Sequence, residues 1–107
     1  MAYDETIAEA IRQLLGQRKD VAEKRLVGGG LGFMVGGNLC CGISSRGLTV
    51  RVGAEGKQAA VAMEHVGPLA FGGKETAAFV VVAPEALEDP DILAAWVGRG
   101  LKFVETL

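Results

Sequence analysis

The glycine-rich stretch 28–42, which reads GGGLGFMVGGNLCCG, constrains the fold more than any other part of the chain. It holds seven of the sixteen glycines. Two short apolar runs, 31–35 and 39–41, flank the turn sequence Gly36-Gly37-Asn38. Because glycine and asparagine tolerate positive φ, this pattern predicts two adjacent antiparallel strands joined by a tight turn. The three glycines at 28–30 are expected to bend or bulge the chain just before the first of these strands.

The same glycines also invite comparison with a phosphate-binding loop. In a G-x-G-x-x-G pattern, however, the third glycine would fall on Phe33, and no helix is expected to follow it. A nucleotide phosphate needs the N-terminus of such a helix. We therefore interpret the stretch as a bulged hairpin and expect no cofactor.

Helical patterns occur at both ends of the chain and once in the middle. Apolar residues after Asp4 recur with helical spacing, which predicts an N-terminal helix that begins at this N-cap and stops at Gly16. Asp89-Pro90 predicts the start of a closing helix, and the residues within 54–65 favour a short middle helix.

The remaining apolar segments have strand character. Residues 21–28 predict a first strand, and 48–53 alternate strictly, with Thr49 and Arg51 on the face opposite Leu48 and Val50. Two further runs, 68–71 and 76–83, flank a turn at 72–75. The second run lacks alternation, as a strand covered on both faces or a central strand would. We expect three or four strands before the middle helix. The fold expected is α+β with the order α-β-β-β-α-β-β-α, in which helices cover one face of an antiparallel sheet of about five strands.

Composition narrows the classes of protein. A chain of 107 residues, half of them hydrophobic, fits one domain, 1–107. A net charge of −2 argues against nucleic acid as a partner. The longest apolar run, 77–84, has eight residues, far below the roughly 20 that a membrane span needs, and the N-terminus does not resemble a signal peptide. Two adjacent cysteines fit a reducing compartment, so we expect a cytoplasmic protein.

Several sequence blocks, in this order, resemble the TfoX N-terminal domain family. They are Glu23-Lys24-Arg25, the segments 29–35 and 37–42, the strand 48–53, the hairpin 71–79, and Ala95-Trp96-Val97 with Gly100, Leu101 and Phe103. The family takes its name from bacterial competence regulators, in which a second domain follows. The resemblance implies a non-enzymatic regulatory or interaction domain, and because the chain ends at Leu107 we expect a stand-alone version.

The residue types that carry catalysis do not form a recognisable constellation. Cys40 and Cys41 would point to opposite faces of an extended strand, which places one of them in the core. His65 could act as a base for a thiol, but no orienting partner is marked, and these three residues fall short of a zinc site. We therefore expect no catalytic, metal or cofactor-binding residue. The alternative hypothesis is a small-molecule-binding domain or uncharacterised enzyme that uses a thiol or basic site near the glycine-rich hairpin.

Four basic residues are the candidates for contact with a ligand or partner: Arg51, Lys74, Lys24 and Arg25. Arg51 stands in an otherwise apolar strand and could bind a carboxylate, although the solvated face of a half-buried strand would also explain it. Lys24 and Arg25 belong to a basic cluster with Arg18 that Asp20 and neighbouring acids dilute. The predicted partner is a protein or a second copy of this chain, and no membrane contact is expected.

Overall fold

The computed structural model describes residues 3–26, 28–71 and 73–107. Three α-helices, one short 3-10 helix and six strands occupy these ranges: α1 Glu5–Leu15, β1 Val21–Arg25, β2 Leu31–Val35, β3 Asn38–Ser44, β4 Gly47–Arg51, α2 Gly53–Val61, β5 Val66–Phe71, β6 Lys74–Val82, η1 Pro84–Glu88 and α3 Pro90–Val104. None of the helices in the described ranges has the length and hydrophobicity of a membrane span.

The predicted helix ends are confirmed in atomic detail. The Asp4 carboxylate accepts hydrogen bonds from the backbone N–H groups of Thr6 and Ile7, and Gly16 closes α1 with a positive φ of 64°. At α3, the Asp89 side chain accepts from the Asp91 N–H group, and Pro90 occupies the first helical position. Local side-chain chemistry therefore fixes where both helices begin.

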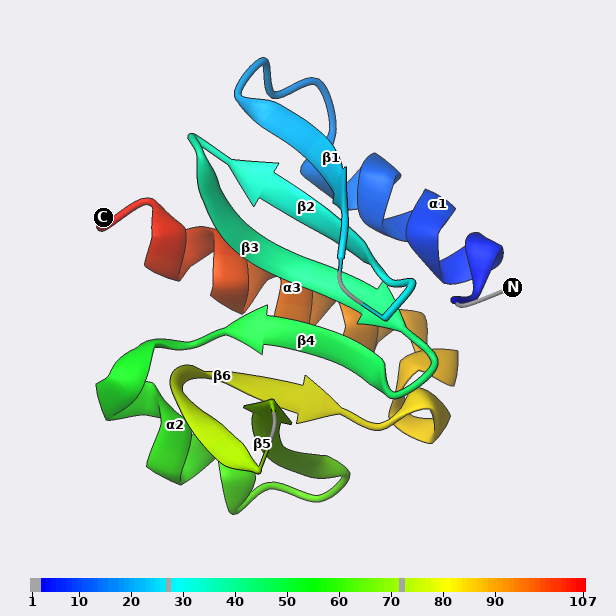
Figure 1. Cartoon of the computed structure of the whole chain (residues 1–107). Helices are drawn as coiled ribbons and strands as arrows, with labels where there is room; N and C mark the ends of the chain where they lie inside the picture. The colour runs from blue at the N-terminus through cyan, green and yellow to red at the C-terminus, as the bar shows by residue number, and fades with distance from the viewer. Residues whose placement is uncertain (1–2, 27, 72) are drawn as a thin grey trace.

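The strands form one antiparallel sheet in the order β1-β2-β3-β4-β6-β5 (Figure 1). The α+β class and the antiparallel sheet are confirmed. The sheet has six strands, close to the expected number of about five, because four strands precede α2, the larger of the two numbers expected there. The first strand also ends at Arg25, short of the predicted residue 28, and Val27 lies outside the described residues. β6 lies between β4 and β5, which confirms its prediction as a central strand.

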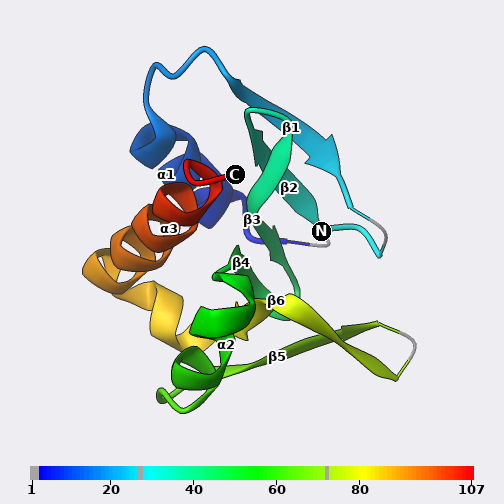
Figure 2. The ribbon, with the colours of Figure 1, turned by 90° about the vertical axis from the view of Figure 1, so that its left-hand side faces the viewer.

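All three α-helices cover the same face of the sheet (Figure 2). Cross-strand pairing places Leu31, Ile43, Leu48 and Val82 in one row, and every member is buried in the core against these helices. Gly100 of α3 packs directly on the sheet, since a Cβ atom at this position would lie 2.9 Å from the carbonyl oxygen of Cys40. The core therefore lies between the helices and one sheet face, and none of the helices in the described residues lies on the other face.

The glycine-rich stretch forms the β2–β3 hairpin, as its composition predicted. Gly36 and Gly37 both have positive φ and make the tight turn. The expectation that Cys40 and Cys41 face opposite sides, with one in the core, is wrong, because both are fully buried. Met34 pairs with Leu39 and Phe33 pairs with Cys41, so Cys40 is an extra residue in a β-bulge. The bulge interrupts the alternation of side chains, and both thiols enter the core.

Candidate interaction surface on the open sheet face

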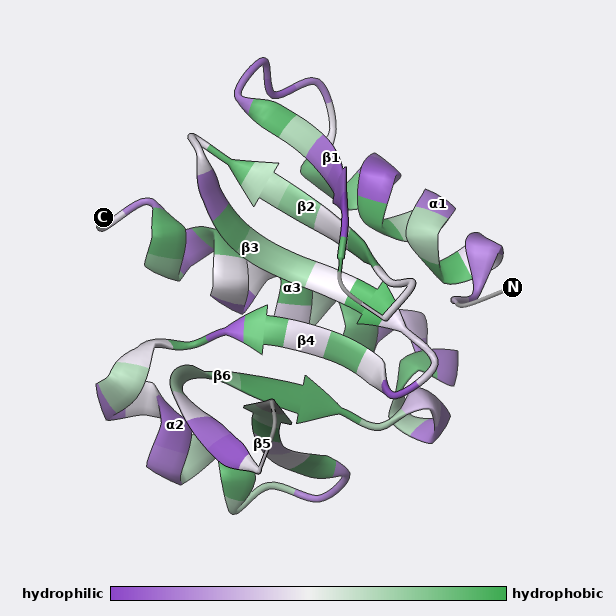
Figure 3. Ribbon diagram, viewed as in Figure 1, coloured by the Kyte–Doolittle hydropathy of each residue, from purple (hydrophilic) through white to green (hydrophobic). Residues whose placement is uncertain are grey.

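The sheet face opposite the helices, which we call the open face, has an unusual lining. Gly32, Gly42, Thr49 and Val81 lie side by side in adjacent strands, in the row next to the buried core row. All four members of the helix-covered row are branched aliphatic residues, whereas this row has two glycines, a threonine and only one such residue, Val81. The central strands are nevertheless largely apolar along their length (Figure 3).

A groove of about 700 Å³ lies on the open face. Leu26, Leu39, Leu69 and Phe79 form its apolar walls, and Thr49 lies between them. The other residues that line the groove are all polar or glycine: Gly28, Gly30, Ser44, Ser45, Arg46 and Thr76. The segments that contribute these residues are far apart in the sequence, so folding is required to assemble the groove.

Glycines make room for one wall of the groove. A Cβ atom on Gly32 would lie 2.8 Å from Cδ2 of Leu26, and a Cβ atom on Gly42 would lie 2.8 Å from its Cδ1. The Leu26 side chain therefore lies flat against β2 and β3. Any residue larger than glycine at position 32 or 42 would clash with it. The backbone N–H group of Leu26 donates to the Gly30 carbonyl oxygen and holds the residue there.

Two arginines lie at opposite ends of β4 on this face. Arg46 lines the groove and donates through Nη1 to the carbonyl oxygen of Ala70 at 3.4 Å. Arg51 places its guanidinium 4.8 Å from the centre of the Phe79 ring, and its buried Nε has no hydrogen-bond partner in the described structure. Within residues 3–26, 28–71 and 73–107, neither arginine forms an ion pair.

The family model of the TfoX N-terminal domain matches residues 13–104, nearly the whole chain. The chain belongs to this family. No curated protein and no solved structure shows significant similarity to it. The match includes every strand of the sheet, so the open face described above is part of the TfoX N-terminal domain itself.

The four basic residues singled out from the sequence do not form one cluster in this TfoX N-terminal domain. Lys24 pairs across the strands with Gly32 and so belongs to the open face, whereas Arg25 pairs with Leu31, in the core row, and is exposed at the sheet edge. Lys74 is exposed at the start of β6. Arg51 was open to interpretation as a solvated residue, but the structure shows it half-buried against Phe79.

Ion pairs neutralise the other arginines near β1. Arg12 contacts Glu5, Glu9 and Glu23, and its hydrogen bonds to Glu23 hold the pKa of that carboxyl below its usual value. Arg18 pairs with Asp20 and Glu105 and likewise lowers the pKa of Asp20. These pairs are partly exposed, so they position side chains more than they stabilise the fold. The basic cluster predicted around residue 18 is therefore largely compensated.

The thiols lie on the side of the sheet away from the groove. Gly100 of α3 packs against Cys40, which places this residue in the helix-covered layer. Interaction with Cys41, followed by the charges of Arg18 and Arg51, lowers the pKa of the Cys40 thiol, while the interaction with Cys40 and burial raise that of Cys41. The acidic neighbours of His65 are Glu64 and Glu85. Within the described residues no cluster of metal-ligating side chains is present.

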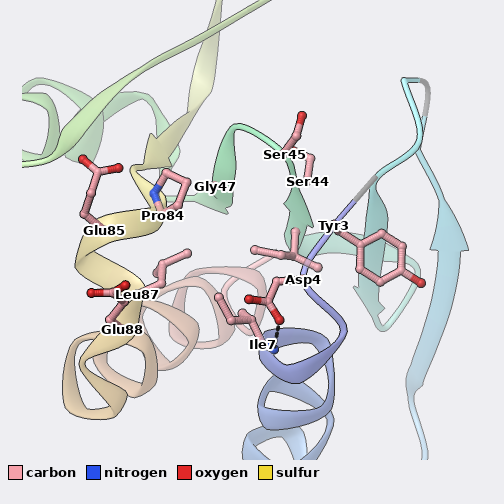
Figure 4. Close-up of a pocket in the computed structure, with 11 residues that line it drawn as sticks. Tyr3, Asp4, Ile7, Ser44, Ser45, Gly47, Pro84, Glu85, Leu87 and Glu88 are labelled. Atoms are coloured by element: carbon pink, nitrogen blue, oxygen red, sulfur yellow. Dashed lines mark hydrogen bonds between the residues drawn. The ribbon is translucent and has the colours of Figure 1, made fainter. Parts of the chain in front are cut away.

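A second pocket, of about 530 Å³, lies between the start of α1, the β3–β4 turn and η1 (Figure 4). Its acidic groups are Asp4, Glu85 and Glu88. The Asp4 carboxylate is already used as the N-cap of α1, which the dashed contact in Figure 4 marks. This pocket is therefore less suited to binding a ligand than the groove on the open face.

Sequence reasoning missed Arg46 and the apolar walls of the groove. Arg46 stands in the turn sequence Ser44-Ser45-Arg46-Gly47, where a basic residue carries no functional signal. The alternate glycines at 30 and 32, with Gly42 in the next strand, were the available signal. In neighbouring strands they indicate one face without side chains, onto which another segment can fold.

Proposed function

We propose that this TfoX N-terminal domain is a non-enzymatic regulatory module of the kind found in bacterial competence regulators, and that it acts in the cytoplasm by binding a protein partner. The observation that carries the proposal is the uncovered open face with its apolar groove. A sheet normally buries its apolar surface against another layer, whereas the groove walls Leu26, Leu39 and Phe79 are only half-buried, which makes this face a candidate interaction site. The burial of both thiols in the core favours binding over thiol chemistry.

The test is affinity capture from a native lysate with quantitative mass spectrometry, combined with a mass measurement of the purified domain. Leu39→Gln changes a wall of the groove, and Leu14→Gln is the control, because Leu14 is 43% exposed on α1, on the other side of the sheet. We expect a partner that wild type and Leu14→Gln retain and Leu39→Gln loses. A partner captured equally by all three proteins, or a monomer that captures none, would refute the proposal.

The dimensions of the groove support a second candidate function. Its volume of about 700 Å³ falls within the range of roughly 300–1,000 Å³ typical of small-molecule sites. A small-molecule-binding domain is therefore the alternative function. In this groove Arg46 would contact the ligand, and the thiols considered from the sequence would not, because they are buried in the core. A thermal shift with an anionic metabolite that Leu39→Gln abolishes, without any protein partner, would favour it.

A further inference from the structure

We propose that the segment bound on the open face is an acidic amphipathic helix of a partner protein, with two carboxylates that pair with Arg46 and Arg51. This inference rests on the proposed function and adds the chemistry of the partner. It uses two features of the open face: the unpaired charges at the ends of β4 and the apolar walls between them.

The basic residues on and beside the open face indicate an acidic partner. Lys24, Arg46 and Arg51 all lie on or beside the open face, and the described residues that line the groove include no carboxylate. By contrast, Arg12 and Arg18 on the other side are each paired with two or more carboxylates. A guanidinium binds a carboxylate through charge-assisted hydrogen bonds, and among the described residues Arg51 lies against the Phe79 ring and forms no ion pair.

The position of the groove indicates that the bound segment of the partner is a helix. An added strand would pair with β1 or β5, at an edge of the sheet, whereas the groove lies over the central strands. A helical layer is one of the stable ways to cover the face of a sheet, and α3 packs in this way on the opposite face of this one. A partner helix would supply the layer that this chain does not provide, with its apolar stripe against Leu26, Leu39 and Phe79.

The spacing of the arginines defines the partner further. Five residues of extended chain separate the Cα atoms of Arg46 and Arg51 by roughly 16 Å. A helix rises about 1.5 Å per residue, so two acidic residues about eleven positions apart span this distance and lie on the same helical face. The partner is therefore expected to carry acidic residues about three turns apart, with apolar residues between them.

Nucleic acid fits these observations less well. Phosphate binding needs a concentrated basic surface, while this face has three cations around aliphatic walls and the chain has a net charge of −2. Base stacking needs exposed aromatic faces, and the Phe79 ring already lies against Arg51.

The experiment uses two labelled probe peptides of about 15 residues with the same apolar stripe. One carries glutamates about eleven positions apart, and the other carries lysines at the same two positions. Fluorescence anisotropy measures both affinities for the full chain at low salt, and amide chemical shifts of Gly42 and Thr49 report whether the peptide occupies the groove. We expect the acidic peptide to bind about tenfold more tightly.

Charge reversal provides the decisive comparison. Arg46→Glu and the double variant Arg46→Glu/Arg51→Glu should transfer the preference to the basic peptide, whereas Arg25→Glu, at the exposed sheet edge, should leave it unchanged. Circular dichroism establishes that each variant is folded, and Arg46→Glu alone suffices as a test, because Arg46 is exposed.

Several results would overturn the inference. They are equal affinity for the two peptides, a preference that Arg46→Glu does not alter, binding of a single-stranded oligonucleotide at the groove instead of either peptide, or self-association that Leu39→Gln abolishes. If the native partner is lost on Leu39→Gln but kept on both charge reversals, the acidic partner is wrong and the proposed function stands. If Leu39→Gln keeps the partner, the proposed function itself fails.

Discussion

Gly100→Ala tests how closely α3 packs on the sheet. An alanine Cβ atom at this position would lie 2.9 Å from the carbonyl oxygen of Cys40, 3.2 Å from Cγ1 of Val50 and 3.3 Å from Sγ of Cys40. The nearest of these atoms belongs to the backbone of β3, which is hydrogen-bonded to strands on both sides. It cannot move as the end of a flexible side chain would, so the helix itself must move away from the sheet.

Two opposing effects determine the magnitude. Alanine is more favourable than glycine in a helix interior by about 0.8–1.0 kcal/mol, and an extra methyl group in a well-packed core costs roughly 1–3 kcal/mol. We expect packing to dominate and Gly100→Ala to lower the free energy of unfolding by about 1 kcal/mol. For a domain of this size, that corresponds to a fall in Tm of roughly 4–6 °C.

Gly98 provides the matched control two residues away in the same helix. It is exposed, and a Cβ atom there would meet nothing within 4 Å. Gly98→Ala should therefore show only the higher helix propensity of alanine and raise the free energy of unfolding by about 0.5–1 kcal/mol. Urea unfolding followed by circular dichroism measures both variants. Equal changes in the two variants, or stabilisation by Gly100→Ala, would refute the packing argument.

Two further predictions concern titration and thiol reactivity. Arg12 lowers the pKa of Glu23 in the folded state, so this carboxylate contributes stability above its ordinary pKa of 4.5 that is lost as the pH falls through the lower folded value. The contribution of this pair to the free energy of unfolding should be below about 1 kcal/mol, because the pair is partly exposed. Glu23→Gln should therefore flatten the dependence of Tm on pH in this acidic window. An unchanged dependence of Tm on pH would contradict this prediction. Cys40 and Cys41 are fully buried, so a thiol reagent such as DTNB should modify neither in the native state and both in urea, and rapid native labelling would show that the packing is wrong.

Local chemistry made the helix ends and the main hairpin predictable. Asp4 and Asp89 cap helices through hydrogen bonds to residues two or three positions away, so the signal and its effect are both local. Gly36-Gly37 likewise provides the positive φ angles that its own turn needs. Such features depend little on the rest of the fold and can be predicted from a single sequence.

Features that depend on distant segments were not predictable in the same way. The bulge at Cys40 results from the pairing of β2 with β3, and strict alternation therefore gave the wrong orientation for one thiol. The environment of Arg51 depends on Phe79, which reaches it only because β6 inserts between β4 and β5. The groove has the same origin, since Leu26 and Leu39 form its walls together with Leu69 and Phe79, which lie at least 30 residues further along the chain.

The unequal faces of β2 and β3 explain why the open face has a groove. Toward the helices these strands present Leu31, Phe33 and Ile43, which are all buried in the core. Toward the open face they present Gly32 and Gly42, which have no side chain to pack against a helix of this chain. Leu26 covers part of that surface, and the space between it and Phe79 remains as the groove. The glycines that shape the hairpin therefore also leave a surface that a second molecule can complete.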